Sequence, residues 1–209
     1  MTSFRLPASF PDSQSFRARL KEIDPELDCK DSTSADSRAM ASPFEFEGRQ
    51  LLNRWAVHPM EGWDGTTDGN PTDDTLRRWF NFGLSGAALV WGGEAFAVCP
   101  EGRANPNQLH QGSHPDPAVG LKKLMAELRR GQSLANFGDS KPVGLPVMQT
   151  LVGLQLTHSG RWSRPTIDGP APRTVFRHEL LDQRAGIDSN EQLLSDDELA
   201  LAPSPFFPA

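Results

Sequence analysis

Ala87-Ala-Leu-Val-Trp91 is a short, continuous apolar run, which is typical of a β-strand buried on both faces. Apolar residues of helical period precede it at positions i, i+3, i+4 and i+7: Leu76, Trp79, Phe80 and Gly83. Thr72 is a good N-cap, and the aspartates that follow it suit the positive end of the helix dipole. Residues 73–84 are therefore predicted to form a helix that leads into this strand.

The same alternation continues toward the C-terminus. Pro117 opens a second predicted helix, whose apolar stripe is followed by two arginines before Gly131. The next apolar run, residues 151–156, predicts another buried strand. The segment 157–190 is predicted to be a long loop, and Ser195-Asp-Asp-Glu is a capping box that opens a further helix.

The alternation also extends toward the N-terminus. Phe44-Glu-Phe-Glu alternates with a period of two, and Gly48 turns the chain, which predicts a hairpin. A buried strand is predicted within residues 51–58. Strands that alternate with helices indicate a parallel sheet with right-handed crossovers. The fold class is thus predicted to be α/β, a partial (β/α)8 barrel of roughly the first three β/α units, preceded by the hairpin and an N-terminal extension.

Three segments are distinguished by their composition. Residues 1–41 are interpreted as an extension, with a short helix marked by Phe16, Leu20 and Ile23 and then a polar linker. Residues 42–199 are assigned to the barrel segment. Residues 200–209 form an atypical tail rich in Pro and Phe.

Composition excludes several classes of protein. The chain has 209 residues, with 21 Lys+Arg against 27 Asp+Glu, and this acidic balance argues against a nucleic-acid partner. No apolar run approaches the roughly 18–20 residues of a membrane span, and the first residues resemble no secretory signal. Two cysteines cannot build a disulfide framework. A cytoplasmic location is expected.

Unusual residues follow three predicted strands, in the loops that begin at His58, Gly92 and Gln155. The carboxyl ends of neighbouring parallel strands form the catalytic face of a β/α barrel. The Gln155 amide both donates and accepts hydrogen bonds, so it suits the edge of a planar heterocycle. Taken alone, however, Gln155 could cap a strand end, and Gly92-Gly93 could be a turn.

Four motifs together resemble the old yellow enzyme family of NADH:flavin oxidoreductases. They are Asn53-Arg-Trp-Ala-Val-His-Pro-Met60, Asp68-Gly-Asn-Pro-Thr72, Glu94-Ala-Phe-Ala-Val-Cys-Pro-Glu-Gly-Arg103 and Gln155-Leu-Thr-His-Ser-Gly-Arg161. They occur in the order of the family and extend over most of residues 42–199. The resemblance implies an FMN-binding β/α barrel.

The resemblance also implies roles for individual residues. Pro59, Met60 and Glu61 would line the flavin ring, Ala95 would let the ring approach the backbone, and Gln155 would pair with its pyrimidine end. His158 and Arg161 would be the catalytic residues, because both lie in the last motif. NAD(P)H would reduce the flavin, which would pass hydride from N5 to a small electron-poor alkene or a related acceptor.

The chain departs from the family pattern in ways that leave alternatives open. A full barrel needs about 250 residues, this chain contains no Tyr as proton donor, and the motifs of the later strands are missing. A truncated flavoenzyme is therefore expected, and the alternative is a non-catalytic remnant or interaction fragment. Substrate and oligomeric state stay open. Glu61, where many relatives carry Thr or Cys, is expected to lower the flavin reduction potential unless the carboxylate is turned away, protonated or paired.

The remaining candidates have simpler interpretations. His110 and His114 have the i, i+4 spacing of metal ligands, but Gly112 and Pro115 exclude a helix there, so no metal site is predicted. A metal-dependent hydrolase that uses His58 and His158 is a third hypothesis. Cys99 is interpreted as a packed thiol. Three tryptophans are predicted to lie in the core: Trp55, Trp79 and Trp91.

Overall fold

The computed structural model describes residues 5–31, 39–110, 118–135 and 150–201. The chain divides into two compact units, Met1–Met40 and Ala41–Ala209. The predicted helix start at Pro117, His114 and most of the 200–209 tail lie outside the described residues. No helix in the described ranges is long and apolar enough to cross a membrane.

The first unit is built on one helix, α1 (Ser13–Ile23), which follows the short 3-10 helix η1 (Pro7–Ser9). The Asp12 carboxylate accepts a hydrogen bond from Ser15 N at 2.7 Å and so caps α1. Arg17 binds Asp28 at 2.7 Å, which ties the segment after the helix back to it. The predicted helix is confirmed, but none of its residues is buried, so its apolar stripe forms no core.

The second unit opens with the predicted hairpin. Strands β1 (Phe44–Phe46) and β2 (Arg49–Leu51) pair antiparallel. Glu47 and Gly48 connect them, and both have positive φ, 46° and 72°. Two left-handed residues match the right-handed twist of the strands, which explains the tight connection.

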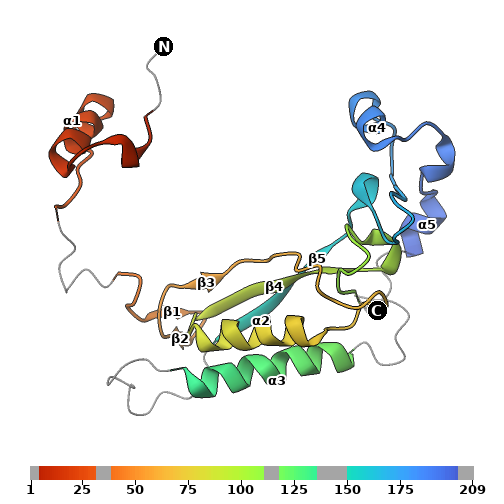
Figure 1. Ribbon diagram of the computed structural model, residues 1–209, viewed down its shortest axis with the longest axis horizontal. Helices are drawn as coiled ribbons and strands as arrows, with labels where there is room; N and C mark the ends of the chain where they lie inside the picture. Colours follow the sequence, from red (N-terminus) through yellow and green to blue (C-terminus); the bar gives the residue numbers. More distant parts are fainter. Residues whose placement is uncertain (1–4, 32–38, 111–117, 136–149, 202–209) are drawn as a thin grey trace. The chain divides into compact units, whose positions relative to one another are not determined.

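A three-stranded parallel sheet follows, in the order β3-β4-β5. Its strands are β3 (Ala56–Val57), β4 (Leu89–Ala97) and β5 (Leu151–Thr157). Helix α2 (Asp73–Leu84) connects β3 to β4, and helix α3 (Ala118–Leu134) lies between β4 and β5 in the chain. Figure 1 shows the two helices side by side along the sheet. The predicted α/β class with a parallel sheet is confirmed.

Helices α2 and α3 approach each other through glycine. A Cβ at Gly83 would lie 2.0 Å from the Leu128 carbonyl oxygen, and one at Gly131 would lie 2.1 Å from that of Phe80. Gly83 therefore belongs to the buried stripe because a side chain would separate the helices. The core is made by apolar side chains of the helices, β4 and the loop after it: Trp79, Val90, Phe96, Leu109, Leu124 and Leu128.

Strand β4 is longer than its sequence predicts. The prediction that a loop begins at residue 92 is wrong. Strand β4 continues to Ala97 and pairs with β5 again from Ala95. The register shifts between Trp91 and Ala95, so the glycines at 92 and 93 produce an irregularity within the strand. The loop begins at Val98, which precedes a short 3-10 helix, η2 (Pro100–Gly102).

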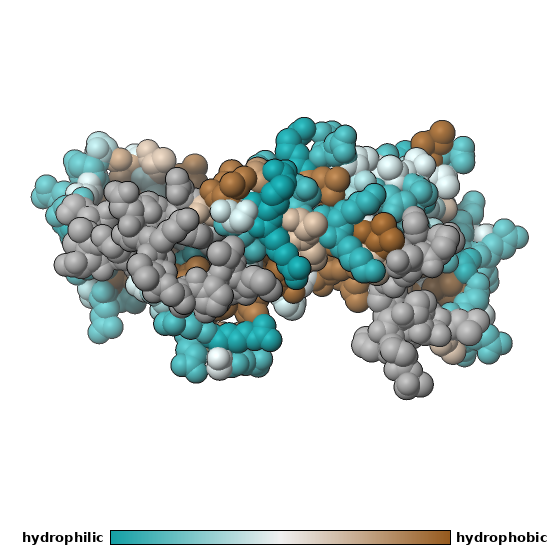
Figure 2. Space-filling model, turned by 90° about the horizontal axis from the view of Figure 1, so that it is seen from below, coloured by the Kyte–Doolittle hydropathy of each residue, from teal (hydrophilic) through white to brown (hydrophobic). Residues whose placement is uncertain are grey.

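The two faces of the sheet have different surroundings. Trp79 is only 1% exposed in the helix-covered core, as predicted, whereas Trp55 and Trp91 are more than half exposed. Side chains alternate along a strand, so Val90 enters the core while Trp91 points to the face without helices. The prediction of core positions for Trp55 and Trp91 is therefore wrong. Figure 2 shows hydrophobic side chains at the surface among hydrophilic ones.

The segment after β5 contains more structure than the predicted loop. It forms η3 (Gly160–Trp162), α4 (Glu179–Ala185) and η4 (Asn190–Gln192) before α5 (Asp196–Leu201). The capping box of α5 is confirmed, because Ser195 N donates to Glu198 at 2.8 Å and Glu198 N donates to the Ser195 hydroxyl at 3.3 Å.

Candidate functional site

Gly92 lies where two of the predicted site residues meet. Its φ is +61°, in the left-handed region, and a Cβ here would lie 2.8 Å from Gln155 N and 2.9 Å from Pro59 Cβ. The loop after β3 and strand β5 thus approach β4 at a point that only glycine can occupy without strain.

Met60 and Ala95 join the same group. Ala95 N donates to the Met60 carbonyl oxygen at 3.1 Å, and Ala95 is the register partner of Gln155. The structure therefore brings Pro59, Met60, Ala95 and Gln155 together. We call these four residues, with Gly92, the Gly92 cluster.

The Gln155 side chain is exposed. Its amide has no hydrogen-bond partner within the described parts of the chain. Its backbone is held firmly by β4. Nearby, Gln108 is buried and donates to the Ala95 carbonyl oxygen at 2.8 Å and to the Thr157 hydroxyl at 3.1 Å, so the adjoining ends of β4 and β5 are fixed.

Glu61 directly follows the cluster, and its carboxylate accepts one hydrogen bond. Its Oε2 accepts from the Trp63 indole Nε1 at 2.9 Å. The indole is neutral, so this bond does not cancel the negative charge of Glu61, and the expected lowering of the flavin potential stays a prediction.

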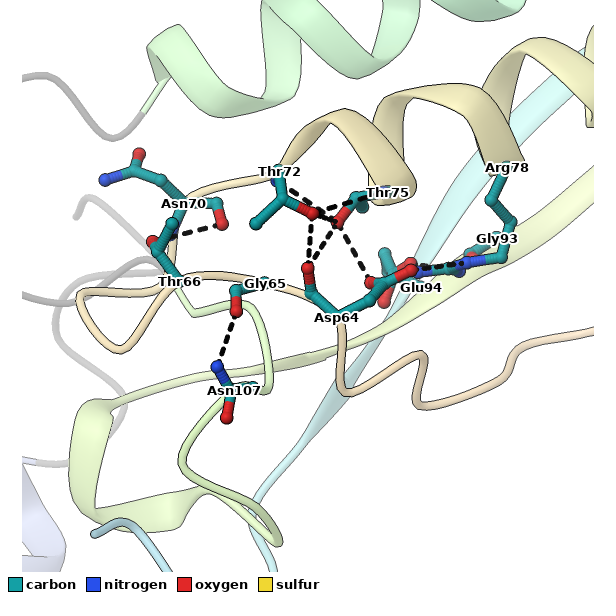
Figure 3. Close-up of polar contacts among 10 residues, drawn as sticks. All are labelled: Asp64, Gly65, Thr66, Asn70, Thr72, Thr75, Arg78, Gly93, Glu94 and Asn107. Atoms are coloured by element: carbon teal, nitrogen blue, oxygen red, sulfur yellow. Dashed lines mark hydrogen bonds and ion pairs between the residues drawn. The ribbon is translucent and has the colours of Figure 1, made fainter. Parts of the chain in front are cut away.

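A charge network that includes the buried Glu94 links α2, β4 and the loop before α2 (Figure 3). The Arg78 guanidinium binds Asp64 with two nitrogens, at 2.7 and 3.2 Å, and forms a close ion pair with Glu94 through the third. Glu94 is 1% exposed. Burial raises the pKa of Glu94 to about 7, and the charge of Arg78 opposes that rise.

The network connects three segments of the unit. Arg78 belongs to α2, Glu94 to β4, and Asp64 to the loop that continues from Glu61. The Thr75 hydroxyl donates to Asp64 at 2.9 Å, and Arg78 also donates to the Gly93 carbonyl oxygen at 3.2 Å. These bonds fix the loop, the helix start and the irregular part of β4 together, so the network positions the Gly92 cluster.

His158 and Arg161 have separate contacts. His158 Nδ1 accepts from Gly160 N at 3.0 Å, and burial lowers the pKa of His158, so the neutral ring is favoured. Arg161 binds Asp182 at 2.7 Å and donates to the Phe176 carbonyl oxygen at 2.7 Å. Arg161 does not pair with Glu94, whose cationic partner is Arg78.

The other candidates contribute little to this site. His58 is exposed at the end of β3. The described residues, which include His58 and His158, contain no group of three potential metal ligands, so nothing in them supports a metal-dependent hydrolase. Burial raises the pKa of the Cys99 thiol, which agrees with a packed and unreactive cysteine.

Sequence reasoning missed two residues that shape the site. The sequence leaves open that Gly92 is in a turn, whereas it lies within β4 at the register shift, and a glycine inside a strand pattern is also typical of a bulge. Arg78 was not singled out. Glu94, a carboxylate in an otherwise apolar strand, could have signalled that a buried cation must face it.

Comparisons with known proteins agree with this fold. No family model matches the sequence, and no curated protein matches it. Among solved structures, Old Yellow Enzyme from Pichia sp. AKU4542 is similar over 78% of this chain and 39% of its own, with 18% identity and a TM-score of 0.52. Morphinone reductase is similar over 68% of this chain and 33% of its own, with 21% identity and a TM-score of 0.46.

A third similar structure is the old yellow enzyme homologue from Zymomonas mobilis, at 17% identity over 66% of this chain and 33% of its own, with a TM-score of 0.48. The chain spans between 17% and 39% of the length of such structures. The parallel sheet with its flanking helices therefore defines an α/β protein with part of a β/α-barrel fold. That part is shared with old yellow enzyme, so the resemblance drawn from the four motifs is confirmed at the level of the fold.

Proposed function

We propose that this chain belongs to the old yellow enzyme family and carries the flavin-contacting part of an FMN-dependent oxidoreductase. The observation that supports this most is the Gly92 cluster. It joins four of the five residues that the motifs assign to the flavin, where β4 and β5 pair beside the loop after β3. Sequence similarity and spatial convergence thus agree on Pro59, Met60, Ala95 and Gln155.

Three features of these residues support an isoalloxazine ring as the ligand. Gly92 leaves no side chain between Pro59 and Gln155, Ala95 is small, and the Gln155 amide is exposed without a partner in the described ranges. Pro59, Met60, Glu61, Ala95 and Gln155 would hold the ring, with the amide fixing its orientation. Bound FMN would accept hydride from NAD(P)H and deliver it to a small electron-poor alkene or a related acceptor.

His158 and Arg161 take different parts in this proposal. Neutral His158 keeps its Nε2–H available as a donor to a small molecule, because Nδ1 already accepts from Gly160. Arg161 is held by Asp182 and by the Phe176 carbonyl. We therefore assign Arg161 a positioning role, in which it holds the segment after β5 against the turn that carries His158.

The direct test is to titrate the full chain with FMN and to measure binding by the quenching of flavin fluorescence. Gln155→Leu should weaken binding roughly tenfold, because a net hydrogen bond contributes about 1–1.5 kcal/mol. Gln50→Leu, an exposed strand glutamine in β2, is the matched control and should bind FMN as the parent does. A chain that folds but takes up no FMN would instead support the non-catalytic alternative.

Glu61 provides a test of the flavin environment. Glu61→Thr removes a negative charge, so the midpoint potential of bound FMN should rise, by about 1 kcal/mol in the free energy of reduction for charges roughly 4 Å apart in water. The measurement is equilibrium reduction against a reference dye. Trp63→Phe keeps the carboxylate and removes its N–H donor, so the potential should not rise in this variant. An unchanged potential in Glu61→Thr would show that the carboxylate does not face the ring.

A further inference from the structure

A separate pocket of about 410 Å³ lies beyond the ends of β4 and β5, against the segment that follows β5. Small-molecule sites typically measure about 300–1,000 Å³ and combine apolar walls with few polar groups. Val98, Phe176, Leu194 and Leu199 contribute apolar side chains to this pocket. None of the residues of the Gly92 cluster lines it, so the pocket is distinct from the proposed flavin contacts.

Thr174 gives the pocket an unsatisfied polar group. The residue is 5% exposed, and its hydroxyl has no hydrogen-bond partner among the described residues. Its backbone is fully used, because Thr174 N donates to Gln192 O at 2.9 Å and Leu194 N donates to Thr174 O at 2.7 Å. A buried hydroxyl without a partner is costly. A ligand in the pocket would supply the missing partner.

His158 adds a second donor to the lining of the pocket. Since Nδ1 of the neutral ring accepts from Gly160 N, the ring proton resides on Nε2. No hydrogen bond within the described chain uses that N–H. The residues that line the pocket therefore include two unused donors, an imidazole N–H and a hydroxyl.

The charged side chains that line the pocket are arginines. Arg161, which lines the pocket, and Arg177 share a single carboxylate, Asp182, each at 2.7 Å. Arg173, also in the lining, is matched by Glu198 at 2.5 Å. Arg161 keeps guanidinium N–H groups beyond its bonds to Asp182 and the Phe176 carbonyl. The described lining of the pocket contains Arg161 and Arg173 and no carboxylate, and Glu101, which acts on His158, lies outside the lining. A lining of this kind favours an anionic ligand.

We propose that this pocket binds a small apolar carboxylate, such as an aryl or medium-chain alkyl acid. The apolar part packs against Phe176 and its neighbours, and the carboxylate accepts from the Thr174 hydroxyl and from His158 Nε2–H beside Arg161. The site shares His158 and Arg161 with the proposed function, but it does not require FMN. Binding of an acid by the flavin-free chain therefore tests this site alone, while FMN binding tests the proposed function.

The test is isothermal titration of the full chain with phenylacetate, 3-phenylpropionate and octanoate, each compared with its neutral amide. At least one acid should bind, and its amide should bind at least tenfold more weakly. Failure of all three acids to bind at millimolar concentration, or equal binding of acid and amide, would overturn the proposal.

Thr174→Val tests the site at the level of one atom. The substitution keeps the shape of the side chain and removes only a hydroxyl that has no partner, so folding should be unharmed and thermal stability equal or higher. The affinity for the acid should fall five- to tenfold. Thr67→Val, at an exposed threonine outside the pocket, should change nothing. If Thr174→Val binds the acid as tightly as the parent chain does, the hydroxyl does not contact the ligand and the assignment is refuted.

Discussion

Arg78→Met should lower the free energy of unfolding by roughly 3–5 kcal/mol at pH 8, because removal of one partner from a buried ion pair leaves an uncompensated buried charge. Here that charge is the Glu94 carboxylate, which is 1% exposed. Asp64 loses its partner too, but it is partly exposed and keeps the Thr75 hydroxyl as a donor. Urea unfolding followed by circular dichroism measures the change.

Two variants make this prediction specific to the buried pair. Arg77→Met removes the neighbouring arginine, whose side chain is 70% exposed and pairs with Asp74 on the surface. It should cost less than about 1 kcal/mol. The double variant Arg78→Met with Glu94→Gln should recover much of the loss, because no buried charge is left unpaired. A double variant as unstable as Arg78→Met alone would contradict the electrostatic account.

The same pair predicts a dependence on pH. The pKa of Glu94 in the folded chain, about 7, lies above its ordinary value of 4.5, so the folded state binds a proton more readily than the unfolded state between those values. The contribution of Glu94 to stability therefore falls as pH rises through this window, and Glu94→Gln should remove that slope. The loss caused by Arg78→Met should also be smaller at pH 5, where Glu94 is protonated. A loss independent of pH would contradict this.

Gly92→Ala should have the second large effect, a destabilisation of about 3 kcal/mol. The left-handed conformation costs an alanine roughly 1–2 kcal/mol, and overpacking adds about 1–3 kcal/mol. The added methyl group would press on Pro59 and on Gln155. Since both residues are proposed flavin contacts, FMN affinity should also fall by at least tenfold, measured by the fluorescence titration used for Gln155→Leu.

Gly186→Ala is the matched control for this prediction. Gly186 ends α4 with a φ of +68°, close to that of Gly92, but a Cβ there would meet nothing within 4 Å. It should show the backbone cost alone, roughly 1–2 kcal/mol, with unchanged FMN affinity. If the two variants lose equal stability and both keep FMN affinity, the close approach at Gly92 carries no function.

Local signals explain which elements could be predicted from the sequence. Helix α2 was predicted at its observed bounds because Thr72, the acidic first turn and the apolar stripe all agree. Strand β5 and the cap of α5 rest on equally local patterns. Helix α4 was missed because it has only seven residues and its anchor, Asp182, is bound by Arg161 and Arg177 through tertiary contacts.

The candidate site was predictable only in part, for a related reason. The motifs named Pro59, Met60, Ala95 and Gln155, and these residues converge. The partner of Glu94 was not predictable, because many arginines are available and pairing depends on how α2 packs on β4. A pair of glycines also has the same sequence pattern in a turn and in a bulge. The end of β4 was therefore predicted too early.

The unequal environments of the tryptophans have an optical consequence. Only Trp79 is enclosed in the core, while Trp55, Trp63, Trp91 and Trp162 are each more than half exposed. Exposed indoles emit much as they do in water, in the folded and the unfolded chain alike. The shift of the emission spectrum on denaturation should therefore arise mainly from Trp79, which α2 directs into the core against the sheet. Its emission reports whether the packing of α2 on the sheet is intact.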